Sequence, residues 1–298
     1  MSENYENVLT IKNLTVAFAD SGTRAKGRAL KHGGSCEYVK DTKNDESALY
    51  ESAAVKDVSL ELHKGEILAL VGESGCGKTV LCKSILGILC DKARILSGEV
   101  NFGGTNLLTL GEKELRGYRG GKISMVFQDP MTGTAATMGI EENLALARRR
   151  GTKRGLRKGI TQQEREEYKE LLKVLGLGLE NRLTSKVGLL SGGQRQAVAL
   201  LMATLTPLDF LILDEHTAAL DPHTAEIIMH LTDRIVREKH LTAIMVTHNL
   251  RYAVEYGSRL IMMDRGHIVL DKAGDEKQNI STDDILHIFN QISIECGN

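Results

Sequence analysis

Apolar and polar positions alternate along this chain in blocks that predict strands separated by helices. Residues 8–18 and 55–62 alternate as half-buried strands do, whereas residues 66–71 form one continuous apolar run typical of a fully buried strand. A helix is predicted from Gly77 to about Leu89, directly after that run. Later strands are expected at residues 98–102, 123–127, 210–214 and 243–247, and a hairpin turned by Gly266 at residues 259–263 and 267–270.

Helical periodicity interrupts this alternation in the middle of the chain. Candidate helices at residues 140–147, 165–175 and 192–205 follow one another, and they are predicted to form a helical subdomain over residues 130–205. Strands that alternate with helices elsewhere imply a largely parallel sheet. We therefore expect an α/β fold with a mainly parallel sheet, an N-terminal antiparallel β part and an inserted helical subdomain.

One polar segment fits none of these elements. Residues 21–52 are rich in Gly, Lys, Asp and Glu and lie between two predicted strands, so we expect a flexible surface insertion. The chain has 298 residues, which exceeds one average domain, but an α/β unit that carries a helical subdomain uses this length. A single domain over residues 7–298 is therefore predicted.

Composition argues against several classes of function. Lys and Arg total 38 against 39 Asp and Glu, a net charge of −1, so no overall field favours nucleic acid as a partner. The longest apolar stretches fall far short of the roughly 18–20 residues that span a bilayer, and the first residues lack a signal-peptide pattern. Five cysteines without a C-x-x-C pair predict reduced thiols. We expect a cytoplasmic chain that reaches a membrane through partners.

The apolar run over residues 66–71 leads into a phosphate-binding sequence. Residues 72–79 match G-x-x-x-x-G-K-S/T, a loop whose backbone N–H groups cradle phosphates at the start of a helix. Lys78 is expected to reach the β- and γ-phosphates of ATP, and Thr79 to ligate Mg²⁺. Cys76 lies near Lys78 at the helix N-terminus, and both influences favour a thiolate, with a thiol packed against the sheet as the alternative. The predicted nucleotide-binding residues of this loop are Gly72, Glu73, Ser74, Gly75, Cys76, Gly77, Lys78 and Thr79.

Two carboxylates follow the apolar residues of the strand predicted at 210–214. Asp214 is expected to hold Mg²⁺ directly or through water, and Glu215 to polarise the water that attacks the γ-phosphate. A buried pair of carboxylates without a ligand would be costly, which favours the functional interpretation. His216 follows directly and is given no catalytic role. These residues add a P-loop NTPase core to the expected α/β fold.

The five residues from Leu190 to Gln194 read L-S-G-G-Q and open a predicted helix. This string lies downstream of the phosphate loop and upstream of the two carboxylates, and the chain therefore resembles the ATPase subunit of an ATP-binding-cassette (ABC) transporter. Ser191, Gly192 and Gly193 present a second helix N-terminus suited to phosphate. The resemblance implies a head-to-tail dimer, in which these residues and Gln194 complete the nucleotide site of a second ABC ATPase chain, identical or different.

The resemblance assigns roles to four further residues. Gln128 matches the glutamine loop that touches Mg²⁺ and the attacking water, and His248 matches the switch histidine that hydrogen-bonds the γ-phosphate. Phe18 occupies the place of the adenine-stacking aromatic residue, with an ordinary core phenylalanine as the alternative. Asp221 matches the loop that couples the two sites of a dimer, although its position as N-cap of a helix predicted at residues 222–239 could explain it alone.

Two kinds of importer share the resemblance. Residues 72–79, 93–99 and 122–130 look like the ATPases of dipeptide, oligopeptide and nickel importers, whereas residues 141–147 and 214–221 look like a bacterial ATPase linked to import of aromatic amino acids. The implied function is the ATP-binding and ATP-hydrolysing subunit of a bacterial importer of peptides, amino acids or similar small solutes. The alternative is a soluble ABC ATPase that serves a non-transport assembly, such as iron–sulfur cluster biogenesis.

An importer subunit implies membrane partners. The resemblance predicts integral membrane permease subunits, with a solute-binding protein as an indirect partner, and it places the chain peripherally on the inner face of the cell membrane. A short permease helix is expected to dock within about residues 131–151, with Met131, Met138, Ile140 and Leu144 as apolar anchors.

Overall fold

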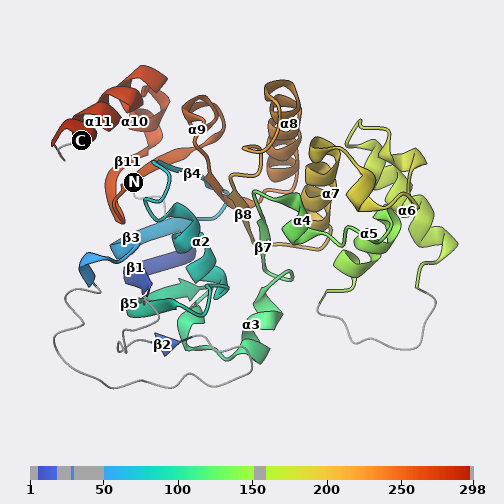
Figure 1. Ribbon diagram of the computed structural model, residues 1–298, viewed down its shortest axis with the longest axis horizontal. Coiled ribbons are helices and arrows are strands. Elements are labelled where there is room, and N and C mark those ends of the chain that lie inside the picture. Colours follow the sequence, from blue (N-terminus) through green and yellow to red (C-terminus); the bar gives the residue numbers. More distant parts are fainter. Residues whose placement is uncertain (1–5, 19–27, 30–49, 151–158, 296–298) are drawn as a thin grey trace. The chain divides into compact units, whose positions relative to one another are not determined.

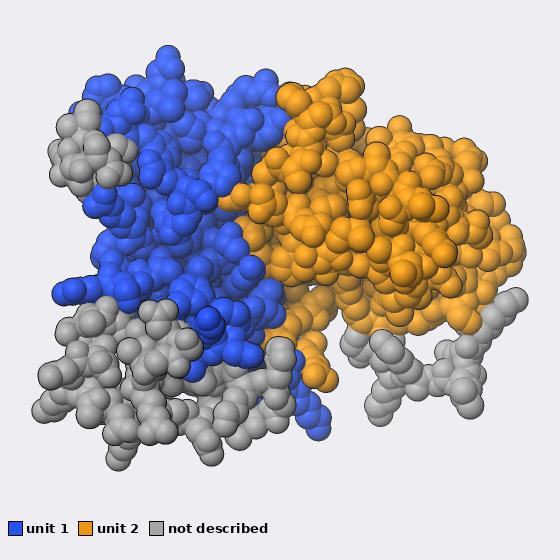
Figure 2. Space-filling view, viewed as in Figure 1, with its two compact units in different colours: residues 1–115, 242–298 blue, residues 116–241 orange. Residues whose placement is uncertain are grey.

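Two compact units make up the chain (Figure 2). The first comprises Met1–Leu115 and Thr242–Asn298, and the second comprises Arg116–Leu241. The computed structural model describes residues 6–18, 28–29, 50–150 and 159–295.

An antiparallel sheet forms the N-terminal part of the first unit (Figure 1). Strand β1 (Asn7–Phe18) lies between β3 (Val55–His63) and β5 (Ala93–Phe102) and is antiparallel to both. Burial alternates over the first half of β1, where Leu9 and Ile11 enter the core, but Leu14–Ala17 are all buried, unlike the alternation that the sequence predicts. The N-terminal antiparallel β part is confirmed. Two short strands, β2 (Arg28–Ala29) and β6 (Thr105–Asn106), pair with β5.

Strand β2 belongs to the polar segment predicted at residues 21–52. Most of that segment lies outside the described residues, so its flexibility stays a prediction.

Parallel strands form the second sheet region of this unit. Strand β4 (Ile67–Gly72) pairs in parallel with β9 (Thr242–Val246) and β10 (Arg259–Asp264). Strand β11 (His267–Ala273) returns antiparallel to β10, and Arg265 and Gly266 adopt φ of 44° and 89° in the turn, as a tight hairpin requires. The helices of this unit are α2 (Lys78–Leu86), α9 (Leu250–Tyr256), α10 (Gly274–Gln278) and α11 (Thr282–Glu295), with a 3₁₀ turn at Leu107–Thr109.

Two element boundaries differ from the sequence prediction. Helix α2 ends at Leu86 rather than near residue 89, because Gly87 takes a left-handed φ of 62° and its N–H donates to a carbonyl of the last turn. Strand β5 begins at Ala93 rather than residue 98, and Gly98 continues it through a register shift. A Cβ on Gly98 would lie 2.5 Å from Leu14 Cα, so the glycine permits the close approach of β1.

The second unit combines two parallel strands with a series of helices. Strand β7 (Ile123–Val126) pairs in parallel with β8 (Phe210–Asp214). Helix α7 packs against β7 and against three other helices, α4, α5 and α8. The helices are α4 (Pro130–Gly133), α5 (Ile140–Arg148), α6 (Gln162–Lys173), α7 (Gly192–Thr204) and α8 (Pro222–Glu238), with 3₁₀ turns at Leu179–Asn181 and Val187–Leu189; α3 (Glu112–Tyr118) runs into this unit from the first. The predicted helical stretch, residues 130–205, lies within the second unit, and its independence as a subdomain stays a prediction.

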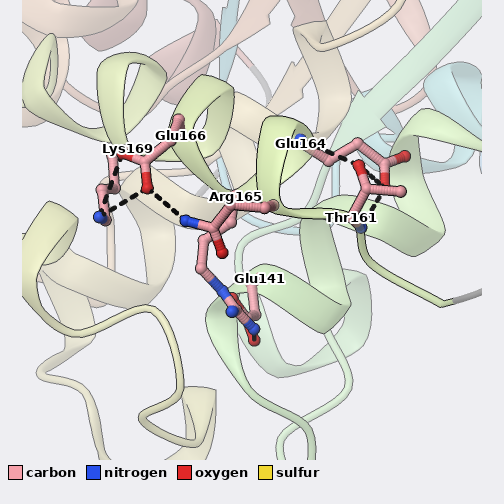
Figure 3. A network of polar contacts seen from close by, with 7 residues as sticks. Glu141, Thr161, Glu164, Arg165, Glu166 and Lys169 are labelled. Carbon is pink, nitrogen blue, oxygen red and sulfur yellow. Dashed lines mark hydrogen bonds and ion pairs between the residues drawn. The ribbon is translucent and has the colours of Figure 1, made fainter.

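Ion pairs hold α5 against α6 (Figure 3). Arg165 donates through Nε and Nη2 to the two carboxylate oxygens of Glu141, at 2.6 and 2.8 Å, and the Glu141 side chain is only 8% exposed. At the start of α6, Thr161 and Glu164 form a capping box, and Glu164 also pairs with Arg149 at 2.9 Å. A bidentate pair fixes both distance and orientation, so α6 is tied to α5 in one arrangement.

Asn143 fastens α5 to the loop that precedes it. The side chain is fully buried, and its Oδ1 accepts the Ala135 N–H at 2.7 Å. Its Nδ2 donates to the carbonyls of Ala135 and Gly139, at 3.1 and 2.9 Å. One side chain therefore pairs with several backbone groups of this loop, in addition to the backbone contacts that the loop makes with the 3₁₀ turn at Val187–Leu189.

We expect Asn143→Ala to lower the free energy of unfolding by about 2–4 kcal/mol, because it removes the hydrogen bonds that a buried side chain makes with Ala135 and Gly139. Urea unfolding of the full chain measures this change. Asn181→Ala, at an exposed position, is the control and should change the free energy by less than about 0.5 kcal/mol. Equal losses in the two variants would contradict the structural role of Asn143.

Candidate functional site

Glycines shape the loop between β4 and α2. Gly72 ends β4 with φ of 149°, and a Cβ there would lie 2.2 Å from the Met263 carbonyl oxygen. Gly77 precedes α2 with φ of 107°, and a Cβ there would lie 2.1 Å from the Ala54 carbonyl oxygen. Both contacts are too short for any side chain, so the loop path between these residues needs glycine at both ends.

The loop offers positive charge and an uncapped helix end. Lys78, 4% exposed, donates through Nζ to the carbonyls of Gly72 and Glu73 at 2.8 and 2.7 Å, which holds the ammonium against the loop. No side chain caps α2, and its first turn contains no acidic residue. The helix dipole and Lys78 therefore favour an anion here, and this donor set fits the phosphates of a nucleotide. Thr79 follows Lys78 in the first turn of α2.

Cys76 differs from the sequence prediction. Its side chain is 4% exposed, and burial raises the pKa of the Cys76 thiol. Lys78 opposes this shift, with Nζ 3.6 Å from Sγ, but desolvation is the larger influence. The expectation of a thiolate is therefore wrong, and the structure agrees with the alternative of a buried thiol.

His248 lies at the same edge of its sheet as the phosphate loop. In the parallel pair of β4 and β9, Leu70 is opposite Val246. Gly72 and His248 each come two residues later, so they lie at the same edge of these neighbouring strands. His248 is exposed, and the residues around it are fixed because Thr247 Oγ1 accepts the Asn249 N–H at 3.0 Å.

Phe18 ends β1 in the same unit. Its side chain is 40% exposed, which argues against the alternative of an ordinary core phenylalanine.

The second unit carries the two carboxylates and Gln128. Asp214 ends β8 and is 5% exposed, and Glu215 follows with a left-handed φ of 49°. Val126 of β7 is opposite Leu213 of β8, so Gln128 and Glu215 both come two residues later, at the carboxyl edge of this parallel pair. The carbonyl of Phe127, just before Gln128, accepts a hydrogen bond from Gln196 of α7 at 3.3 Å.

Among the described residues, no group of three or more His, Cys, Asp or Glu side chains could hold a metal ion. Mg²⁺ often takes only one or two carboxylates and completes its shell with water and substrate phosphates. In the first unit, Thr79 offers a hydroxyl oxygen. In the second unit, Gln128 offers an amide oxygen and Asp214 a carboxylate. Each of these is a hard oxygen ligand of the kind that Mg²⁺ accepts.

The L-S-G-G-Q sequence forms the start of α7 by a capping box. Ser191 Oγ accepts the Gln194 N–H at 3.3 Å, and Gln194 Oε1 accepts the Ser191 N–H at 3.2 Å. A Cβ on Gly193 would lie 2.1 Å from Thr224 Cγ2, so Gly193 lets α7 begin directly against the first turn of α8. A Cβ on Gly192 would lie 3.2 Å from Leu220 Cδ2.

Asp221 caps α8. Its Oδ1 accepts the Thr224 N–H at 3.0 Å, and Pro222 occupies the first turn, as the sequence predicts. The N-cap role is therefore observed, and a role between two sites of a dimer stays a prediction.

His216, which the sequence analysis gives no catalytic role, is buried in the second unit. The ring is 2% exposed, and burial lowers the pKa of His216 to about 4. Its Nε2 lies 3.0 Å from Thr232 Oγ1 in α8. The only signal in the sequence is a histidine directly after Glu215, and nothing local to it identifies Thr232 as the partner.

Two of the four expected docking anchors are wrong. Ile140 and Leu144 are fully buried, because the apolar face of α5 packs inside the second unit. Met131 is 37% exposed and Met138 is half-buried, and on the outer face of α5 Leu146 is 43% exposed. Within the described part of the chain, no helix is both long and apolar enough to cross a bilayer.

The family described as ABC transporter matches residues 55–218. A tyrosine transport ATP-binding protein of Clostridioides difficile (strain R20291) is 40% identical over 78% of this chain and 90% of that protein. The dipeptide transport ATP-binding protein DppD of Bacillus subtilis (strain 168) is 38% identical over 72% of this chain, and the match spans 63% of the longer relative.

Solved structures give the same fold. A dimeric ATP-binding cassette in a post-hydrolysis state, bound to ADP and Pi, superposes with a TM-score of 0.66 and 27% identity over 89% of this chain and 98% of that one. An ATP-binding cassette of an ABC transporter in its ADP conformation superposes with a TM-score of 0.68 at 22% identity, over 98% of this chain and all of that one. The expected α/β fold with a P-loop NTPase core is confirmed.

The contact between Gly193 and Thr224 gives a test. We expect Gly193→Ala to lower the free energy of unfolding by about 1–3 kcal/mol and to reduce ATP turnover, because the new methyl group would displace the start of α7 from α8. Adding Thr224→Ser removes the methyl group that collides and keeps the hydroxyl, so the double variant should recover both properties. Thermal unfolding and phosphate release measure them. A double variant as impaired as Gly193→Ala would show that this contact is not the cause.

Proposed function

The chain belongs to the ABC transporter family as an ATP-binding ATPase subunit, and from this premise we propose that it serves a bacterial importer of peptides, amino acids or similar small solutes. The observation that carries the proposal is the 40% identity to a tyrosine transport ATP-binding protein, which extends over most of both chains. Dipeptide transport relatives support the same class of solute. These relatives are transport proteins, and they give no support to the alternative of iron–sulfur cluster assembly.

Each unit contributes part of the proposed chemistry. The phosphate loop of the first unit binds the nucleotide, where Lys78 neutralises the β- and γ-phosphates and Thr79 contributes a hydroxyl ligand to Mg²⁺. His248, at the same sheet edge, hydrogen-bonds the γ-phosphate. Phe18 stacks on the adenine, which its 40% exposure permits.

In the second unit, Asp214 holds Mg²⁺ and Glu215 polarises the attacking water, while Gln128 contacts both. Mg²⁺, when bound, neutralises charge that develops on the phosphate oxygens. Glu215 accepts a proton from the water as the water oxygen attacks the γ-phosphorus. The bond between the γ-phosphorus and the bridging oxygen breaks, which gives ADP and inorganic phosphate.

The start of α7 belongs to the proposed dimer. Ser191, Gly192, Gly193 and Gln194 present a capped helix N-terminus that suits the phosphate of a nucleotide held by a second chain. Support comes from the dimeric cassette that this chain resembles. Asp221 directly follows Leu220, whose side chain lies beside Gly192. In this proposal, Asp221 couples the two nucleotide sites of the dimer.

We expect Glu215→Gln to reduce kcat for ATP by about 10²–10⁴-fold while ATP binding is retained, because the amide cannot accept the proton of the water. Lys78→Ala should instead weaken ATP binding by about 10–100-fold, because it removes a charge-assisted contact with phosphate. Lys83→Ala, at the other end of α2, is the control and should bind ATP normally. Phosphate release and nucleotide titration measure these effects. Retention of more than about a tenth of the rate by Glu215→Gln would refute the role of Glu215.

The proposed membrane partners are permease subunits, which would hold the chain peripherally on the inner face of the membrane, with a solute-binding protein as an indirect partner. Exposed apolar side chains remain in the segment expected to dock, at Met131 and Leu146. An exposed methionine is adaptable enough to accept a partner helix.

We expect the tagged chain, purified from its own cells in detergent, to bring integral membrane proteins with it. Met131→Glu should reduce that recovery at least about threefold, because a charge would be placed against an apolar partner helix. Leu286→Glu, at a side chain 45% exposed on α11, is the matched control. Quantitative mass spectrometry of the copurified proteins measures both. Recovery of soluble assembly proteins in place of membrane subunits would refute the importer proposal.

A further inference from the structure

We propose that His216 and Thr232 form a positioning pair that holds the backbone of Glu215 in place. This inference rests on the proposed function, which assigns the attacking water to Glu215. The pair touches neither nucleotide nor water in this proposal, and it acts through the residue next to the carboxylate. All three residues lie in the second unit.

The backbone at Glu215 needs support. Its φ of 49° lies in the left-handed region, which costs a residue other than glycine roughly 1–2 kcal/mol. On the N-terminal side, Asp214 ends the buried strand β8. On the C-terminal side, the Glu215 carbonyl accepts the Ala218 N–H at 2.9 Å in a turn. The next residue, His216, has a side chain that is held by its contact with Thr232.

The hydrogen bonds of Thr232 define how His216 is held. Thr232 Oγ1 lies 2.7 Å from the Ile228 carbonyl oxygen, which can only accept, so the hydroxyl proton is donated there. The same Oγ1 lies 3.0 Å from His216 Nε2 and must therefore accept from it. This arrangement places a proton on Nε2, which donates it to Thr232.

Burial protects the hydrogen bond between His216 and Thr232 from water. His216 and Thr232 are each 2% exposed, so water does not compete for the hydrogen bond. The residue after Glu215 is thus attached to the interior of α8, and a shift of the turn would break a buried hydrogen bond.

Loss of this link should change catalysis more than binding. A misplacement of about 1 Å in a reacting group can cost as much as 10²-fold in rate. Removal of a supporting hydrogen bond behind a functional residue typically costs about 10-fold or more. ATP affinity depends on the phosphate loop, which belongs to the other unit, so it should remain.

The test compares two substitutions at Thr232 with a matched control in the full chain. Thr232→Val keeps the shape and removes the acceptor of the His216 N–H, whereas Thr232→Ser keeps the hydroxyl. Thr204→Val is the control, because Thr204 is 1% exposed and its hydroxyl likewise donates to its own helix, to Leu200 O at 3.0 Å, with no histidine beside it in the described contacts. We expect Thr232→Val to lower kcat about tenfold with an ATP Kd within about twofold of wild type. Thr232→Ser and Thr204→Val should keep kcat within about threefold.

Phosphate release gives kcat, titration with a fluorescent ATP analogue gives Kd, and thermal unfolding reports the folded fraction. If Thr232→Val does not fold, His216→Gln and His216→Leu make the same comparison, because Gln retains an N–H donor and Leu does not. The Gln variant should then retain at least about three times the kcat of the Leu variant.

A wild-type kcat in Thr232→Val, or equal losses in Thr232→Ser or Thr204→Val, would overturn the positioning pair. In the Glu215→Gln background, Thr232→Val should cause no further loss of the residual rate, because the carboxylate that it positions is gone. A further tenfold loss there would show that the pair acts elsewhere and would also overturn it. Failure of the proposed function is distinguishable, since in that case Glu215→Gln itself retains turnover.

Discussion

Parallel strand pairing is the constraint on which the arrangement of this protein depends. Adjacent parallel strands end at the same edge, so residues that follow them in register are brought together without direct side-chain contact. In one unit this places His248 at the edge that carries Gly72, and in the other it places Gln128 at the edge that carries Glu215. The buried apolar runs of the strands therefore determine where the polar chemistry lies.

Sequence reasoning succeeded where the requirement is local. The glycines at residues 72 and 77, the N-cap Asp221, and the hairpin turn at Gly266 follow from backbone geometry that a short segment specifies by itself. It failed where a distant element decides. Periodicity predicts an apolar face on α5 but not that this face is covered, so Ile140 and Leu144 were wrongly expected to be accessible.

Cys76 shows how two correct local arguments can be outweighed. A helix N-terminus and a neighbouring lysine both favour thiolate, but desolvation acts in the opposite direction and depends on packing that the sequence does not display. Asn143, Gln196 and the pair of Arg165 with Glu141 were missed for a related reason. Each bonds a group in another element or loop, and a polar residue in a helical pattern is normally interpreted as solvent-exposed.

The hydrogen bond of His216 fixes the position of the neighbouring backbone more closely than apolar packing would. An apolar side chain at that position would gain burial energy in several rotamers, whereas a ring that donates to Thr232 is fixed in both position and orientation. The hydroxyl of Thr232 is itself fixed, because its proton is committed to Ile228. The backbone beside Glu215 is therefore held in place by a side chain of α8. Since the start of α8 also lies against Gly193 at the start of α7, one helix provides a common support for the carboxylate turn and the L-S-G-G-Q segment.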